Sequence, residues 1–182
     1  MLSAHHPDAR PPINAREAIL RLSQGMVPHT PGCEPREAAV CESVLRYLLQ
    51  QPLADAPQPR RYYVAQQGRD PDEALLSRLR TLVPAVQPLS ECRVSAREGV
   101  VDRATGARGV IVQVARLAWV HAAAVDVVGG YYLTHRHAAG LRYHVEQQGD
   151  HWAVTAAHLL WRVYTPSSQG RHTRSVDRHM AP

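Results

Sequence analysis

The chain has 182 residues and a formal net charge of +5, which is enough length for one domain with a hydrophobic core. Much of the basic excess lies in the first 33 residues and in the tail from residue 165, and both signs are interspersed between these ends. A duplex-binding protein gathers its basic residues on one face or helix, so this distribution argues against nucleic-acid binding. No stretch approaches the roughly 18 apolar residues of a membrane span, and we expect no membrane partner.

The amino-acid usage indicates a GC-rich, bacterial genome. All 21 basic residues are arginines, Phe is absent, and Asn14 is the single asparagine. The N-terminal segment lacks the apolar region of a signal peptide, and Cys33, Cys41 and Cys92 show no zinc-binding spacing. These features favour a cytoplasmic protein with reduced thiols. If an upstream start codon hides an export signal, a disulfide joining Cys92 to Cys33 or Cys41 is the alternative.

Two helices are predicted ahead of most of the strands. Residues 1–33 are predicted to be a flexible N-terminal segment, with a short helix expected to begin at Asn14. The sequence "EPREAAVCESVLRYLLQQ" then predicts a helix with Pro35 in its first turn, because Val40, Val44 and Leu48 recur every four residues. "RRYYVAQ" follows as a short strand rich in Tyr and Val.

The sequence "GRDPDEALLSRLRTLVP" predicts the second helix. Asp70 is expected as its N-cap, Pro71 at the first helical position, and Glu73 as the second half of a capping box. Its apolar stripe consists of Leu75, Leu76, Leu79, Leu82 and Val83. A one-sided stripe of this kind indicates a helix that lies on a sheet.

The rest of the chain reads as successive strands. "ECRVSA" comes first, "RATGA" is expected as a hairpin tip between "VVD" and a long strand, and "AAAVDVVGGYYLT", "GLRYHVEQ" and "HWAVTAAHLLWRV" follow. Gly149 and Asp150 predict a two-residue hairpin turn, and the pair Gly129–Gly130 predicts a bend or bulge. Residues 165–182 lose all periodicity and are predicted to be a disordered basic tail.

This order of elements predicts a single α+β domain over residues 34–164, with helices packed on a curved, cone-like antiparallel sheet. The element order and the closing hairpin "GLRYHVEQQGDHWAVTAAHLLW" resemble the nuclear transport factor 2-like superfamily, which includes ketosteroid isomerase. In residue identity the resemblance covers Gly149, Asp150 and Trp152. It implies a fold and often a dimer, but no particular reaction, because one scaffold hosts many functions.

The histidines raise the question of a metal site. His135 and His137 are spaced to share one strand face, as metal ligands in β-barrel enzymes are. The next acidic residue, Glu146, comes nine positions after His137 and beyond an Ala-Ala-Gly break. We therefore interpret the pair as surface histidines in a turn, expect His144 and His151 at the surface as well, and predict no metal and no cofactor.

Asp126 and His158 are the candidate catalytic residues, because both lie within apolar strands. A carboxylate held in a dry pocket has a raised pKa and can act as a general base. Enzymes of the superfamily that the chain resembles use an Asp, sometimes with a His, inside the cone. Here Tyr62, Tyr132 or Tyr143 would supply a phenol. The alternative is that Asp126 lies on the outer face of the sheet.

Because Phe is absent, the other aromatic residues must supply much of the core. We expect an apolar pocket lined by Tyr62, Trp119, Tyr132, Tyr143 and Trp161. The predicted function is a non-catalytic module that binds a small apolar ligand and forms a homodimer or binds a protein partner. One alternative is an isomerase, dehydratase or cyclase with Asp126 as base, and another is an immunity-like or regulatory protein.

Overall fold

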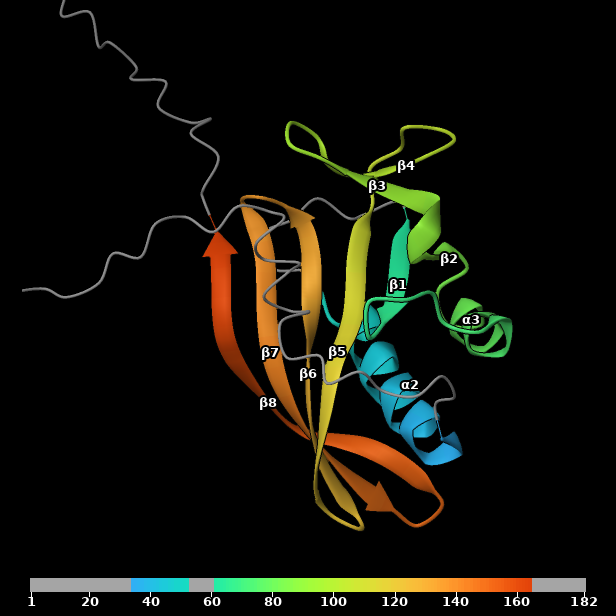
Figure 1. Cartoon of the computed structure of the whole chain (residues 1–182), viewed down its shortest axis with the longest axis vertical. Coiled ribbons are helices and arrows are strands. Elements are labelled where there is room, and N and C mark those ends of the chain that lie inside the picture. The colour runs from blue at the N-terminus through green and yellow to red at the C-terminus, as the bar shows by residue number, and fades with distance from the viewer. Residues whose placement is uncertain (1–33, 53–60, 165–182) are drawn as a thin grey trace, which may run out of the picture.

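The computed structural model describes residues 34–52 and 61–164 (Figure 1). The elements are α2 (Pro35–Gln50), β1 (Tyr62–Gln66), α3 (Glu73–Arg80), β2 (Val86–Pro88), the 3-10 turn η1 (Leu89–Glu91), β3 (Cys92–Ser95), β4 (Gly99–Asp102), β5 (Val110–His121), β6 (Ala124–Thr134), β7 (His137–Gln148) and β8 (His151–Tyr164). The helix expected at Asn14 and the tail from residue 165 lie outside the described residues.

The α+β class is confirmed, but the main sheet is mixed rather than wholly antiparallel. Its six strands have the order β2-β1-β5-β6-β7-β8. Strand β1 pairs in parallel with both β2 and β5, whereas β5 to β8 pair antiparallel through successive hairpins. The expectation of antiparallel pairing was wrong for β1. The chain leaves this strand through α3 and returns in β2, and such a crossover makes the two strands parallel.

Helix α2 covers one face of the six-stranded sheet, which we call the helix face. Its first residue is Pro35, as predicted, and its buried residues form one stripe: Val40, Cys41, Val44, Leu45, Leu48 and Leu49. The helix contacts β1 and all four of the long strands β5 to β8. Its stripe packs on Val112, Val127 and Val145 in the larger of two hydrophobic clusters. The predicted amphipathic helix is therefore confirmed.

Helix α3 begins two residues later than predicted. The carboxylate of Asp72 is the N-cap and accepts a hydrogen bond of 2.7 Å from the amide of Leu75. Asp70 instead accepts from the amide of Ser90, so its assignment as the cap was wrong. Both aspartates precede the same apolar stripe, but Pro71 and Glu73 complete the capping pattern only if Asp70 is the cap, so the pattern favoured the wrong aspartate. The helix ends at Arg80, and it contacts α2 and β2.

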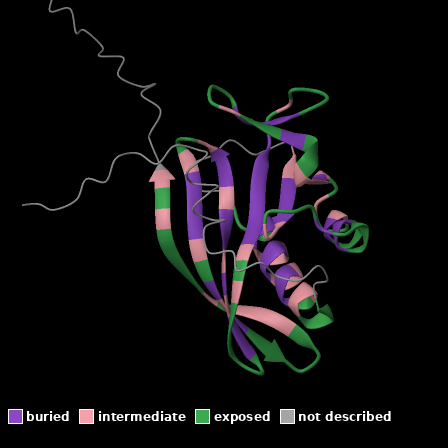
Figure 2. Ribbon diagram, in the orientation of Figure 1, coloured by how far each residue is buried: buried purple, intermediate pink, exposed green. Residues whose placement is uncertain are grey.

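The opposite face of the sheet is partly covered by a separate two-stranded sheet of β3 and β4. Tyr63, Ile111 and Tyr132 meet Cys92 and Val100 there in a second cluster. The "RATGA" segment does turn, but β4 pairs with β3 instead of forming a hairpin ladder with β5, so that part of the prediction was wrong. Figure 2 shows buried residues along α2, β1, the first half of β5 and most of β6, while the second half of β5 and the turn between β7 and β8 are largely exposed.

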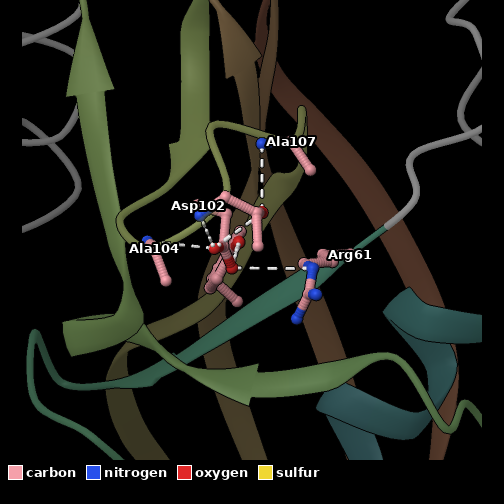
Figure 3. A network of polar contacts seen from close by, with 6 residues as sticks. Arg61, Asp102, Ala104 and Ala107 are labelled. Atoms are coloured by element: carbon pink, nitrogen blue, oxygen red, sulfur yellow. Dashed lines mark hydrogen bonds and ion pairs between the residues drawn. The ribbon is translucent and has the colours of Figure 1, made fainter.

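Asp102, at the end of β4, forms a hydrogen bond and an ion pair with residues at the start of β1 (Figure 3). Its side chain accepts hydrogen bonds from the amides of Ala104 and Thr105 at 3.1 and 2.8 Å, and from the hydroxyl of Tyr63 at 2.8 Å. The guanidinium of Arg61 lies 3.5 Å away. The hydrogen bond from Tyr63, then those from Thr105, lower the pKa of Asp102 to about 2. The carboxylate is therefore charged. Its bonds from Ala104 and Thr105 hold the turn, and its contacts with Tyr63 and Arg61 join that turn to β1.

One predicted turn is confirmed, and one predicted bulge lies in the neighbouring strand. Gln148 pairs with His151, so Gly149 and Asp150 form the two-residue turn, and Gly149 has the positive φ of 65° that such turns require. The Gly129–Gly130 pair does face a β-bulge, although the extra residue belongs to the partner strand β5. A Cβ at Gly129 would lie 2.6 Å from the carbonyl oxygen of Gln113, so the close approach of β5 excludes a side chain there.

The cysteines lie on different faces of the sheet. Cys41 belongs to the cluster under α2, and Cys92 belongs to the cluster under β3 and β4. The Cys92 thiol is free and donates a hydrogen bond to the carbonyl oxygen of Leu89 at 3.2 Å. A disulfide between Cys92 and Cys41 is therefore wrong, while Cys33 lies outside the described residues.

Candidate functional site

A cavity of about 180 Å³ lies between the C-terminal end of α2 and the helix face of β6, β7 and β8. The strand register arranges its floor in rows: Tyr131, Ala139 and Arg162 in one row, Leu141 and Leu159 in the next, and Tyr143 and Ala157 in the third. The two alanines fill little of the space between helix and sheet. A hollow therefore remains between the larger side chains, with Tyr47 and Leu48 of α2 above it.

Tyr143 is the most buried aromatic residue of this cavity, with no exposed surface. Its ring meets that of Tyr47 edge-on, with 5.8 Å between the ring centroids. Burial raises the pKa of Tyr143 far above its usual value, so the hydroxyl keeps its proton. That hydroxyl has no hydrogen-bond partner among the described residues. A buried polar group left in this state costs about 1–3 kcal/mol, which a structure normally avoids.

Arg162 lines the same cavity and is exposed to solvent. A β-bulge opposite Gly140 and Leu141 inserts an extra residue, Leu160, into β8. The bulge reverses the alternation of the strand, so that Arg162 pairs with Ala139 on the helix face while Trp161 pairs with Gly140 on the opposite face. The cavity thus has aromatic and aliphatic walls and one cationic side chain.

Of the five residues predicted to line a pocket, Tyr143 lines this cavity and the other four lie elsewhere. Tyr62 packs at the margin of the helix-face cluster. Tyr132 and Trp161 belong to the opposite-face cluster, where Trp161 lies against Gly140. The hydroxyl of Tyr132 is also buried without a partner in the described part of the chain.

Trp119 lies on the helix face near the start of α2. Its ring meets that of Trp152 edge-on at 5.6 Å, and the guanidinium of Arg36 lies 4.3 Å from the Trp119 ring centre. The Arg36 side chain therefore occupies the aromatic surface that a stacked ligand would use. This contact ties the first turn of α2 to β5 and β8 through a cation–π interaction.

The structure brings Asp126 together with His144 rather than with His158. The Asp126 carboxylate lies 2.8 Å from Nδ1 of His144, and Glu146 lies 3.3 Å from Nε2 of the same ring. The hydrogen bond to Asp126 is the main cause of a raised pKa at His144. His158 pairs with Arg142 and is exposed. Two strand spacings, about 9–10 Å, separate β8 from β6, which prevents a direct contact between the proposed catalytic residues.

The remaining histidines lie at strand ends. His135 is exposed in the turn between β6 and β7, where its ring accepts a hydrogen bond of 3.2 Å from Arg136, and His137 is the first residue of β7. His151 begins β8 directly after the turn, and it is exposed. Within residues 34–52 and 61–164, no three His, Cys, Asp or Glu side chains form a group that could hold a metal ion.

Tyr47, Tyr131 and Arg162 line the cavity but were not predicted from the sequence. Tyr47 has a sequence signal, since it lies one residue before Leu48 in the apolar stripe of α2. Tyr131 also has one, because alternation places it on the same face as Val127. Arg162 has none, because its face depends on the bulge at Leu160.

Comparison of the chain with protein-family models, with curated proteins and with solved structures found no match. Among the described helices, none has the length and apolar character needed to cross a membrane. The function must therefore be argued from the cavity and from the polar groups around it.

Proposed function

We propose that this protein is a non-catalytic binding module that holds one small apolar ligand in the cavity between α2 and strands β6 to β8. The observation that carries the proposal is a cavity of about 180 Å³ walled by Tyr47, Tyr143 and Leu141. An apolar cavity of about 150 Å³ is large enough to bind benzene. The space here suits a single ring or a short aliphatic chain.

The test is a titration of the isotope-labelled full chain with toluene, followed by NMR chemical shifts. We expect saturable shifts at the end of α2 and in β7 and β8. Ala157→Leu adds volume to the cavity wall and should weaken toluene binding by at least about tenfold. Ala156→Leu is the matched control, because Ala156 pairs with His144 on the opposite face of the same strand.

Two results would count against this function. One is the absence of saturable shifts in the wild-type chain at millimolar toluene. The other is an Ala157→Leu variant that binds toluene as tightly as Ala156→Leu does. Mass spectrometry of the natively purified chain adds a direct measurement of any retained ligand.

The resemblance to the nuclear transport factor 2-like superfamily and the cone-like curvature of the sheet belong to this proposal. They are supported by the antiparallel order of β5 to β8 and by the bulges in β5 and β8, since bulges bend long strands. The parallel pairing of β1 is a feature that the resemblance did not lead us to expect. A cytoplasmic location is also part of the proposal, supported by the free thiol of Cys92.

We propose a homodimer formed through β8 as the assembly of this module. Strand β8 has 14 residues and is the last strand of its sheet, so one of its edges has no neighbouring strand in the described part of the chain. Leu159 and Leu160 are 54% and 44% exposed, and a long apolar edge strand tends to pair with another chain.

Analytical ultracentrifugation tests the dimer. We expect the wild-type chain to sediment as a dimer and the variant Leu160→Lys to sediment as a monomer. If the wild-type chain sediments as a monomer at every concentration across a 100-fold dilution series, the dimer is wrong.

The alternative, an isomerase-like enzyme with Asp126 as base, has weaker support. Asp126 is engaged by His144 on a face where its side chain is 35% exposed, so it does not lie in the closed, dry pocket that the enzyme hypothesis requires. A regulatory or immunity-like role would use the same β8 edge with a different chain.

A further inference from the structure

The charge around the cavity carries information about the ligand beyond its size. Arg162 is the cationic residue that lines the cavity, and no Asp or Glu among the described residues lines it. Arg162 also forms no ion pair within residues 34–52 and 61–164. Its neighbours in the same row of the sheet, Ala139 and Tyr131, carry no charge that would compensate the guanidinium.

The aromatic walls alone would favour a different ligand. Tyr47, Tyr131 and Tyr143 surround the space, and clusters of aromatic rings are the usual site for organic cations. A cation here would meet the guanidinium of Arg162 at short range in a partly dry space, where like charges repel strongly. The same guanidinium would attract a carboxylate and can bind both of its oxygens.

We propose that the ligand of this cavity is a small organic monocarboxylate, with its apolar body against Tyr47 and Tyr143 and its carboxylate on Arg162. This inference rests on the proposed function, because it assumes that the cavity binds a ligand. It adds the chemical class of that ligand. Arg162 is then the residue that sets specificity, while the tyrosines and Leu141 set the size and shape of the body.

Three ligands of nearly equal shape separate charge from size: benzoate is an anion, benzamide is neutral, and benzamidine is a cation near pH 7. Calorimetric titration of the full chain should show benzoate binding at least about tenfold more tightly than benzamide, which is the effect of one hydrogen-bonded charge pair. Benzamidine should bind most weakly. Raising the NaCl concentration should weaken benzoate binding and leave benzamide binding nearly unchanged.

The variant Arg162→Gln should reduce benzoate affinity by about tenfold and change benzamide affinity by less than about twofold. Arg142→Gln is the matched control, because Arg142 lies on the opposite face of the neighbouring strand β7 and is also exposed. It should leave the affinities for all three ligands unchanged. Because both arginines are exposed, neither substitution removes core packing.

Different failures identify different errors. The carboxylate inference is wrong if toluene and benzamide bind but benzoate binds no more tightly than benzamide. It is also wrong if Arg162→Gln binds benzoate as tightly as the wild type does. In both cases the proposed binding of an apolar ligand is unaffected. If benzamidine binds best, the sign of the charge is wrong. If toluene and all three ligands fail to bind the wild-type chain, both the inference and the proposed function are wrong.

Discussion

Among single residues, His144 has its protonation set by two carboxylates on one face of the sheet. Asp126 and Glu146 contact its two ring nitrogens at 2.8 and 3.3 Å, and the hydrogen bond to Asp126 is the main cause of its raised pKa. In the folded chain the imidazolium form is therefore favoured. The stability gained from this pair is present at pH values below the unfolded pKa of about 6.5 and is lost as pH rises through the folded pKa.

We predict that Asp126→Asn lowers the pKa of His144 toward its ordinary value, because the variant removes the carboxylate that contributes most. Glu146→Gln should lower it less, since Glu146 is the more distant partner. An NMR titration that follows the His144 ring protons measures both changes. A wild-type pKa of about 6.5 or below, or an equal effect of the two variants, would contradict this account.

Asp102 gives the opposite dependence on pH. The pKa of Asp102 is lowered to about 2 in the folded chain. Its contribution to folding stability is therefore present at pH values above the unfolded pKa of about 3.9 and is lost as pH falls toward 2. We predict that Asp102→Asn is less stable than the wild type at pH 7 and that the difference shrinks on acidification. Thermal unfolding between pH 7 and pH 2.5 measures it. Asp150→Asn, at a fully exposed turn position, is the control that should show no such convergence.

The candidate site illustrates which residues a sequence can place. Tyr143 was predicted to line a pocket and does so, and simple alternation along β7 is enough to put it on the buried face with Val145. Trp161 was expected in the pocket only as an aromatic residue of a predicted strand. The bulge at Leu160 places it on the opposite face and puts Arg162 in the cavity instead. A bulge depends on how two strands fit together, so neither strand alone reveals it.

At the level of elements, the two helices predicted within the described residues and the long strands are present, and the errors concern short strands and distant pairing. Strand β2 was missed because Val86–Pro88 has three residues and ends in proline. The pairing of β1 with β5 was missed because parallel neighbours are joined by long connections and have no turn signature. The hairpin at Gly149 and Asp150 was found because a two-residue turn has a local signature.

The start of α3 provides a test at this level. We predict that Asp72→Ala destabilises the chain by about 1 kcal/mol, because the amide of Leu75 loses its acceptor at the helix start. Asp72→Asn should stay within a few tenths of a kcal/mol of the wild type, since asparagine caps helices equally well. Urea unfolding measures both variants. An Asp72→Ala chain as stable as Asp72→Asn would mean that Asp72 is not the cap.

For the whole molecule, the sheet separates two hydrophobic clusters, one under α2 and one under β3 and β4. The central strands β5 and β6 contribute to both, with Val112 and Val127 on one side and Ile111 and Tyr132 on the other. Strand β8 has a neighbour on one side, and Leu159 and Leu160 are largely exposed. Stability should therefore decline from the middle of the sheet toward β8.

Native-state hydrogen exchange measures this gradient directly. Amides in the middle of β6, around Val127, open only when both clusters are disrupted, so their exchange free energy should equal the unfolding free energy from urea. In the monomer, amides of β8 around Leu159 need only local separation from β7, and they should be at least about tenfold less protected. Benzoate bound in the cavity should raise the protection of β8, because Ala157, Leu159 and Arg162 line that cavity. Equal protection of β6 and β8 in the free monomer would mean that the sheet opens as one unit, and the β8 edge would then be no weaker than the core.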